Sequence, residues 1–162
     1  MIEMTVELSI IVPAFNESAS LPQLYSELTQ TLGGLGRPYE IIFVDDGSTD
    51  DTFEIMEKLH SQDPRVRVIQ FRRNFGKSAA LTAGFSSARG DVIITLDADL
   101  QDDPREIPRF IEAIEREGYD LVSGWKHPRL DPAGIWGQIS GSSRPLFGGI
   151  HARFTPLTRL GA

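Results

Sequence analysis

The chain has 162 residues, with 23 acidic and 16 basic residues, a net charge of −7 and no cysteine. This length corresponds to about one domain, and a hydrophobic content of 40% excludes disordered and collagen-like classes. The absence of cysteine excludes disulfides, thiolate metal sites and cysteine nucleophiles. The acidic balance argues against nucleic acid as a partner, because such binding depends largely on neutralising phosphates.

The amino-terminal residues predict neither a secretion signal nor a membrane segment. Residues 1–7 contain two glutamates and no basic residue, whereas a signal peptide begins with a basic stretch. No run reaches the ~20 apolar residues that would span a bilayer. We therefore expect a cytoplasmic protein, or one that is peripheral at the cytoplasmic face of the membrane.

Apolar runs alternate with amphipathic stretches over residues 1–131. Ser20 and Pro22 suit the start of a helix, the Gly33–Gly34 pair is expected to end it, and Gly90 is expected to stop a later one. In chain order the predicted elements are a strand at 8–12, a helix at 20–32, a strand at 39–44, a helix at 50–60, a strand at 66–71, a helix at 77–88, a strand at 92–96, a helix at 105–116 and a strand at 121–123. Continuous apolar strands separated by helices predict an α/β fold, with a mostly parallel sheet and helices on both faces.

The last 31 residues differ in character from the rest. Residues 132–162 contain no acidic residue, three arginines and six of the 15 glycines, and they show neither a helical nor a strand period. We expect a domain at 1–131 followed by an irregular, Gly-rich C-terminal tail at 132–162. This tail is either a solvated extension, or a truncated or frame-shifted end in place of the segment with which the natural protein continues.

Two aspartates follow the fourth predicted strand. In open α/β sheets, ligands bind beyond the carboxyl ends of the strands, which is where Asp97 and Asp99 are expected. Two carboxylates about 4 Å apart repel each other by about 4 kcal/mol at an effective dielectric of 20, so a cation should lie near them. Oxygen ligands of this kind suit Mg²⁺ or Mn²⁺, although the same pair could simply cap the turn before Pro104.

Two other motifs are ambiguous when taken alone. Asp45-Asp46-Gly47-Ser48 favours a turn, with Ser48 as a candidate helix cap. Alternatively, one of its carboxylates accepts hydrogen bonds from a base or ribose. Gly76-Lys77-Ser78 lacks the upstream glycine of a phosphate-binding P-loop. Lys77 could still neutralise a phosphate at the start of a helix.

Four motifs together resemble family 2 glycosyltransferases of the GT-A (Rossmann-like) fold. The four motifs are Ile10-Ile11-Val12-Pro13-Ala14-Phe15-Asn16-Glu17, Val44-Asp45-Asp46-Gly47-Ser48, Arg73-Asn74-Phe75-Gly76-Lys77 and Leu96-Asp97-Ala98-Asp99-Leu100-Gln101. The last motif, followed by Val122-Ser123-Gly124-Trp125-Lys126, most resembles the dolichol- and polyprenyl-phosphate glycosyltransferases. The likeness covers residues 8–131, and the tail matches nothing of the acceptor-side segment that relatives carry.

The resemblance implies a role for individual residues. Asp97 and Asp99 match the family's Asp-x-Asp motif and would be catalytic, with Asp99 and Gln101 contacting Mg²⁺ or Mn²⁺. Lys126 stands where many relatives have an arginine that faces the donor diphosphate. The residues expected to bind the nucleotide sugar are Pro13, Phe15, Glu17, Val44, Asp46, Asp97, Ala98 and Lys126.

The implied activity is metal-dependent, inverting transfer of a hexosyl unit. The donor would be a UDP- or GDP-linked nucleotide sugar and the acceptor a polyprenyl or dolichyl phosphate, with a membrane surface as a further partner of the full-length form. An anionic phosphate acceptor needs no strong general base. Two alternatives stay open: a cell-surface glycan as acceptor, and a truncated remnant that binds nucleotide without turnover.

Overall fold

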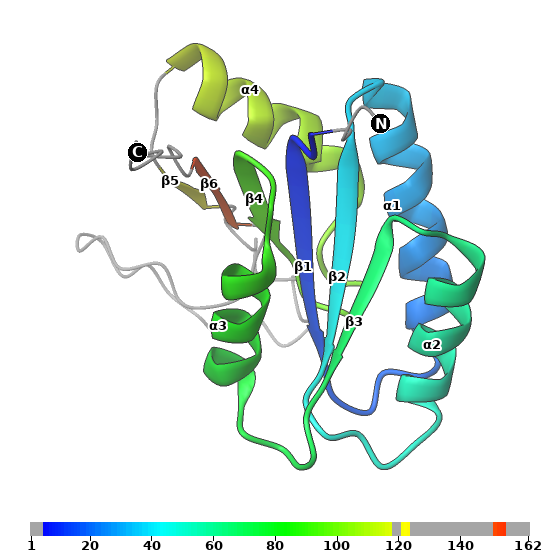
Figure 1. The fold of residues 1–162 in the computed structure, drawn as a ribbon. Helices are drawn as coiled ribbons and strands as arrows, with labels where there is room; N and C mark the ends of the chain where they lie inside the picture. The colour runs from blue at the N-terminus through cyan, green and yellow to red at the C-terminus, as the bar shows by residue number, and fades with distance from the viewer. Residues whose placement is uncertain (1–4, 118–120, 124–150, 155–162) are drawn as a thin grey trace, which may run out of the picture.

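The computed structural model describes residues 5–117, 121–123 and 151–154. Six strands and four α-helices make up these parts, and a short 3₁₀ helix precedes the last α-helix (Figure 1). In chain order they are β1 (Leu8–Ala14), α1 (Leu21–Leu35), β2 (Tyr39–Asp45), α2 (Thr52–Gln62), β3 (Val66–Gln70), α3 (Lys77–Ser87), β4 (Val92–Thr95), η1 (Pro104–Glu106), α4 (Ile107–Glu117), β5 (Leu121–Ser123) and β6 (His151–Phe154).

The strands form one mostly parallel sheet in the order β3-β2-β1-β4-β6-β5. β1 pairs in parallel with β2 on one side and with β4 on the other, and β2 pairs in parallel with β3. β6 runs antiparallel to both β4 and β5. Because the chain builds outward from β1 in one direction and then returns to its other side, the strand order reverses between β1 and β4.

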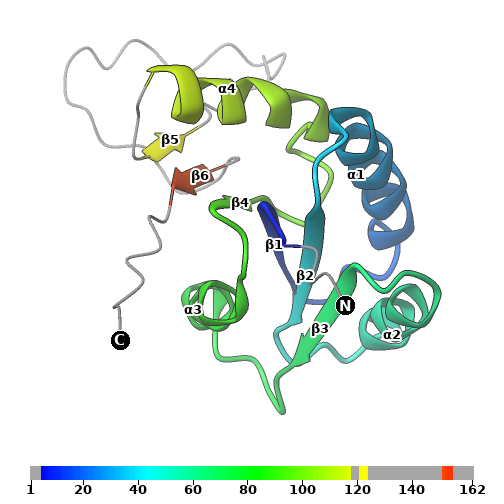
Figure 2. The same ribbon diagram turned by 45° about the horizontal axis from the view of Figure 1, so that its top comes forward.

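Helices cover both faces of the sheet, as predicted, but unequally. Figure 2 shows α3 on one face and α1, α2 and α4 on the other. Alternate residues of β1 point to opposite faces: Leu8, Ile10 and Val12 join the larger core with the three helices, whereas Ile11 joins the smaller core beside α3. This two-residue period within a continuous apolar run is typical of a strand that is buried on both faces.

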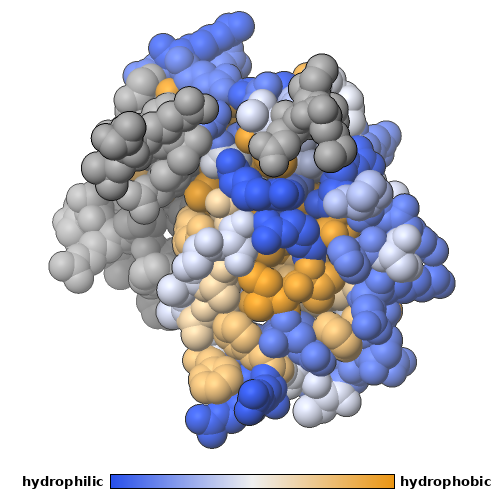
Figure 3. All heavy atoms as spheres, viewed as in Figure 1, coloured by the Kyte–Doolittle hydropathy of each residue, from blue (hydrophilic) through white to orange (hydrophobic). Residues whose placement is uncertain are grey.

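The face covered by α3 alone has the thinner core. Its fully packed members are Ile11, Ile42, Val44, Ala80 and Ile93. Apolar side chains reach the surface on this face (Figure 3), and the partly buried residues that pack against the smaller core are Ile69, Phe71, Leu81 and Ala88. Small residues let α3 lie close to the sheet: a Cβ on Gly84 would lie 2.4 Å from Cγ2 of Ile11.

Three local predictions are wrong. Helix α1 continues through Gly33 and Gly34 to Leu35 and ends at Gly36, whose φ of 63° is the left-handed conformation that suits a helix terminus. Ser20 begins that helix without a side-chain cap, since its hydroxyl donates instead to Glu17. Ser48 is not the cap of α2, which begins at Thr52.

The region predicted as an irregular tail contains a strand. β6 (His151–Phe154) lies between β4 and β5, so β5 is a strand as predicted but is not the neighbour of β4. Four residues without a clear period, preceded by a Gly-rich stretch, gave no local signal for this pairing. The boundary at 131 lies outside the described residues.

None of the helices within the described residues is both long and apolar enough to cross a bilayer.

Candidate functional site

A cavity of about 300 Å³ opens at the carboxyl ends of β1, β2 and β4. Most of the predicted site residues meet there: Glu17, Asp46, Asp97 and Asp99 all line it. The full lining consists of Pro13, Ala14, Phe15, Glu17, Asp46, Asn74, Gly76, Lys77, Ala80, Asp97, Ala98 and Asp99. The cavity lies where the strand order reverses between β1 and β4, the position at which open α/β sheets bind their ligands.

The loop after β1 is held by the loop after β2. The backbone N–H of Asn16 donates to Oγ of Ser48 (2.9 Å), and the N–H of Glu17 donates to Oγ1 of Thr52 (2.8 Å). Asn16 has a φ of 55°, a left-handed conformation that asparagine tolerates better than most residues. These contacts fix the backbone from which Phe15 and Glu17 face the cavity.

An ionised aspartate at the start of α2 strengthens this connection. Asp50 accepts hydrogen bonds from Thr52 and from the N–H of Ser18. The hydroxyl of Thr52 is the main cause that lowers the pKa of Asp50 to about 2. Asp50 therefore keeps its negative charge near neutral pH and holds the loop.

The two acids after β2 have different structural roles. Asp45 is buried, and its Oδ1 accepts from the N–H of Ser48 (3.1 Å), the contact expected of the turn interpretation. Asp46 uses both carboxylate oxygens to hold the loop after β3, accepting from the N–H of Phe75 (2.8 Å) and of Gly76 (2.9 Å). An ionised carboxylate has about four acceptor sites, so these two bonds leave room for a ligand, and the contact of Asp46 with base or ribose stays a prediction.

Gly47 allows the loops after β2 and β3 to touch. It has a φ of 73°, and a Cβ there would lie 2.3 Å from the backbone carbon of Arg73. A side chain at this position would separate the two loops. The loop after β3 can therefore cross the end of β2 and bring Asn74 and Lys77 to the cavity.

The Asp-x-Asp motif lies at the end of β4 with a cation beside it. Nζ of Lys77, the first residue of α3, forms an ion pair with Oδ1 of Asp97. Oδ1 of Asp99 accepts from the N–H of Gln101 (3.0 Å), and the N–H of Asp97 donates to Asp102 (3.0 Å). The expectation of a positive charge near the two carboxylates is met by the chain itself.

The donor set fits a divalent ion that is completed by substrate. Within the described residues no group of three or more His, Cys, Asp or Glu side chains could hold a metal by itself. The two carboxylates of the Asp-x-Asp motif match the pattern in which Mg²⁺ or Mn²⁺ takes one or two carboxylates and completes its shell with substrate phosphates.

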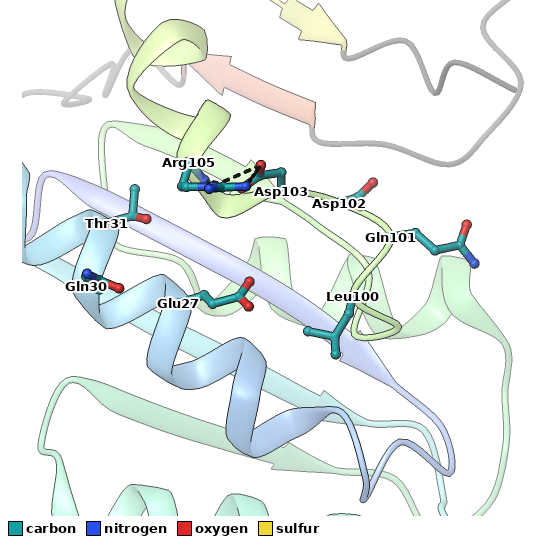
Figure 4. Close-up of a pocket in the computed structure, with 8 residues that line it drawn as sticks. All are labelled: Glu27, Gln30, Thr31, Leu100, Gln101, Asp102, Asp103 and Arg105. Carbon is teal, nitrogen blue, oxygen red and sulfur yellow. Dashed lines mark hydrogen bonds and ion pairs between the residues drawn. The ribbon is translucent and has the colours of Figure 1, made fainter. Parts of the chain in front are cut away.

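Gln101 lies on a different cavity from the other site residues. Its neighbour Leu100 has a φ of 61°, which turns the chain after Asp99. Gln101 then lines a second cavity of about 680 Å³ between α1 and the loop that follows β4. Figure 4 shows Gln101 directed away from the ion pair of Asp103 and Arg105 in that cavity.

The remaining predicted residues divide into three cases. Pro13 and Ala98 are buried and line the first cavity. Val44 is fully buried in the smaller core and does not line it. Lys126 lies outside the described residues.

Asn74 and Gly76 line the cavity although neither was predicted as a site residue; both belong to the Arg73-Asn74-Phe75-Gly76-Lys77 motif. β3 lies at the edge of the sheet and is separated from β4 by both β2 and β1, so its following loop gave no reason to expect a contact with Asp97. The available signal was the Gly76-Lys77 start of a helix, which indicated a phosphate contact for Lys77 but not the position of the loop.

The chain belongs to glycosyl transferase family 2, whose family model matches residues 9–159. One curated relative, an undecaprenyl-phosphate 4-deoxy-4-formamido-L-arabinose transferase from Klebsiella pneumoniae, is 43% identical over 126 residues. That match covers 77% of this chain and 38% of the relative, so the chain spans well under half the length of that relative. The resemblance to polyprenyl-phosphate glycosyltransferases is thereby confirmed.

Solved structures confirm the GT-A type of fold. A mannosyltransferase from Pyrobaculum calidifontis, in complex with GDP-Man and Mn²⁺, aligns with a TM-score of 0.65 at 22% identity and covers 76% of this chain and 36% of its own. A glucosyl-3-phosphoglycerate synthase from Mycobacterium tuberculosis, in complex with Mn²⁺, UDP and phosphoglyceric acid, aligns with a TM-score of 0.56 at 26% identity. This second match covers 72% of this chain and 42% of the other.

Proposed function

We propose that this chain forms the donor-binding part of a glycosyltransferase that moves a sugar from a nucleoside diphosphate to a polyprenyl phosphate. The observation that carries the proposal is the meeting of Phe15, Glu17, Asp97 and Asp99 in one cavity at the switch point of the sheet. An exposed aromatic ring at the mouth and paired carboxylates inside suit a base and a metal-bound diphosphate respectively.

The chain's own residues would orient the donor. Phe15 is 42% exposed and offers a face for a base to stack on. Asp97 and Asp99 would hold Mg²⁺ or Mn²⁺, which when bound supplies Lewis-acid stabilisation of the charge that develops on the leaving diphosphate. The Mn²⁺ in the complex of the mycobacterial synthase supports this choice of ion.

The acceptor is the part of the proposal that rests on the curated relative. The printed name of that relative specifies undecaprenyl phosphate, which supports a polyprenyl-phosphate acceptor and a site of action at a membrane surface. The sugar in that name is an arabinose derivative, a pentose, so the proposal extends to a glycosyl unit in general and the predicted hexose stays one case of it. A phosphate oxygen that is already anionic can attack the sugar without a strong general base.

The site is tested by Asp99→Ala. Isothermal titration calorimetry of UDP and GDP with Mn²⁺ should show binding to the wild-type chain and loss of the Mn²⁺-dependent part in the variant. Asp103→Ala is the matched control, because it removes an exposed carboxylate of the same loop that pairs with Arg105 and lines the other cavity. Unchanged nucleotide affinity in Asp99→Ala, with cooperative thermal unfolding, would refute the assignment.

The acceptor is tested separately with a labelled nucleotide sugar. Label transferred to undecaprenyl phosphate supports the lipid acceptor, and label found instead in an extended glycan rejects it. Nucleotide binding with no transfer to either acceptor would identify a chain that binds donor without turnover.

A further inference from the structure

The positive charge beside the Asp-x-Asp motif is part of the chain. The ammonium of Lys77 pairs with Asp97, and both residues line the cavity that also holds Asp99. Two carboxylates in one cavity repel each other unless a positive charge lies close to them. Lys77 therefore offsets part of the negative charge that the Asp-x-Asp motif brings to this cavity.

The backbone at Lys77 is held in place, whereas its ammonium lies at the end of a flexible side chain. Gly76 precedes the helix with a φ of 96°, and Asp46 holds the N–H of Gly76 and of Phe75. Lys77 thus starts α3 from a fastened loop, and α3 packs on β1 and β2. The rest of the lysine side chain is a flexible four-carbon stem.

The solvent exposure of the Lys77–Asp97 ion pair determines how easily a metal ion can replace the ammonium. The side chain of Lys77 is 49% exposed and that of Asp97 is 21% exposed. Ion pairs that are this accessible to water contribute about 1 kcal/mol or less, because water screens the charges and ordering the side chains costs entropy. An ion with twice the charge of the ammonium can therefore compete with it for the carboxylates.

We propose that Lys77 is the exchangeable counter-ion of the Asp97–Asp99 pair, a positioning residue whose ammonium must yield to the divalent cation that accompanies the donor. The inference rests on the proposed function in one respect only, that a divalent cation binds in this cavity. Its consequence is that the metal alone binds weakly to the wild-type chain, because it must first displace a cation that the fold supplies.

The experiment is a titration of the wild-type chain and three variants with Mn²⁺ alone, in which free Mn²⁺ is followed by electron paramagnetic resonance. Lys77→Met should bind Mn²⁺ about fivefold more tightly than wild type, because the metal no longer has to displace an ion pair that contributes about 1 kcal/mol. Lys77→Arg keeps the charge and should restore weak binding. Lys58→Met removes an exposed lysine of α2 and controls for the change in net charge.

A purely structural role for Lys77 predicts the opposite sign, because loosening the cavity would weaken Mn²⁺ binding. Equal or weaker affinity in Lys77→Met, or an equal gain in Lys58→Met, overturns the inference. Lys77→Gln serves as the uncharged variant if the methionine variant does not unfold cooperatively. If the Lys77 inference fails but the wild-type chain still binds UDP or GDP with Mn²⁺, the proposed function stands. If the wild-type chain binds neither nucleotide with Mn²⁺, the donor site itself is rejected.

Discussion

The two edges of the sheet treat carboxylates in opposite ways. At the amino edge, Glu40 is 1% exposed and accepts hydrogen bonds from the Ser9 hydroxyl, from the Arg89 backbone and side chain, and from Arg67. Burial by itself would raise the pKa of Glu40, but these hydrogen bonds outweigh it and hold the pKa below its ordinary value. The protein satisfies this charge completely with its own groups.

At the carboxyl edge the carboxylates are less enclosed. Asp97 and Asp99 are partly exposed in a cavity, and Asp97 has an ion pair with a half-exposed lysine. Both edges carry acids of similar intrinsic chemistry, so residue type does not distinguish a structural acid from a ligand-binding one. The surroundings do: a buried acid with donors on both oxygens stabilises the fold, and an acid that shares a cavity with other polar groups can bind a ligand.

Glu40→Ala should give the largest loss of stability. Truncation removes the acceptor for Arg67, Arg89 and Ser9 at once, and we expect the free energy of unfolding to fall by about 2–3 kcal/mol, less than for a fully buried pair because both arginines reach solvent. Urea titration followed by circular dichroism measures this loss. The control is Glu112→Ala, whose exposed pair with Arg116 should contribute under about 0.5 kcal/mol; equal losses in the two variants would contradict the contrast between the edges.

Asp46→Ala should have a smaller effect on stability and a second effect on the site. Loss of the acceptor for Phe75 and Gly76 should lower the free energy of unfolding by about 1–2 kcal/mol, since water can reach the freed N–H groups. Asp46→Asn keeps one acceptor oxygen and should lose about half as much. Nucleotide affinity is measured on both variants under conditions in which each is folded. If Asp46 acts by fastening the loop, Asp46→Asn should keep more affinity than Asp46→Ala, and equal losses in the two variants would contradict this role.

The smallest predicted effect is a pH dependence at the amino edge. Hydrogen bonds from the side chain of Arg65 are the main cause that lowers the pKa of Asp63 to about 2, from an ordinary value near 3.8. Because the folded-state pKa lies below the unfolded one, this stabilisation is fully present above about pH 4 and is lost as the pH falls toward about 2. Asp63→Asn should therefore flatten the acid limb of the stability profile in this range, and an unchanged slope would contradict it.

Local patterns were sufficient for the central strands and for most helices. The runs that form β1, β2 and β4 are buried at every position, as expected of strands that are covered on both faces. Helix ends were less predictable. Gly33 and Gly34 lie inside α1, and no neighbouring atom comes close enough to require glycine at either position. β6 could not be foreseen, because its only determinant is pairing with β4 and β5.

The alternation of strands and helices, the family, and the acids that follow β1, β2 and β4 could all be read from residue order, because ligands bind at the carboxyl ends of parallel strands and these acids come directly after strands. What each acid contacts, and whether it faces the cavity, depended on the folded arrangement of the loops. Asp46 holds a neighbouring loop as well as lining the cavity, and Gln101 lines another cavity. Lys77 pairs with Asp97 although β2 and β1 lie between the strands that precede these two residues. These outcomes depend on how loops from separate strands cross at one edge, which is a long-range property that no local pattern of residues encodes.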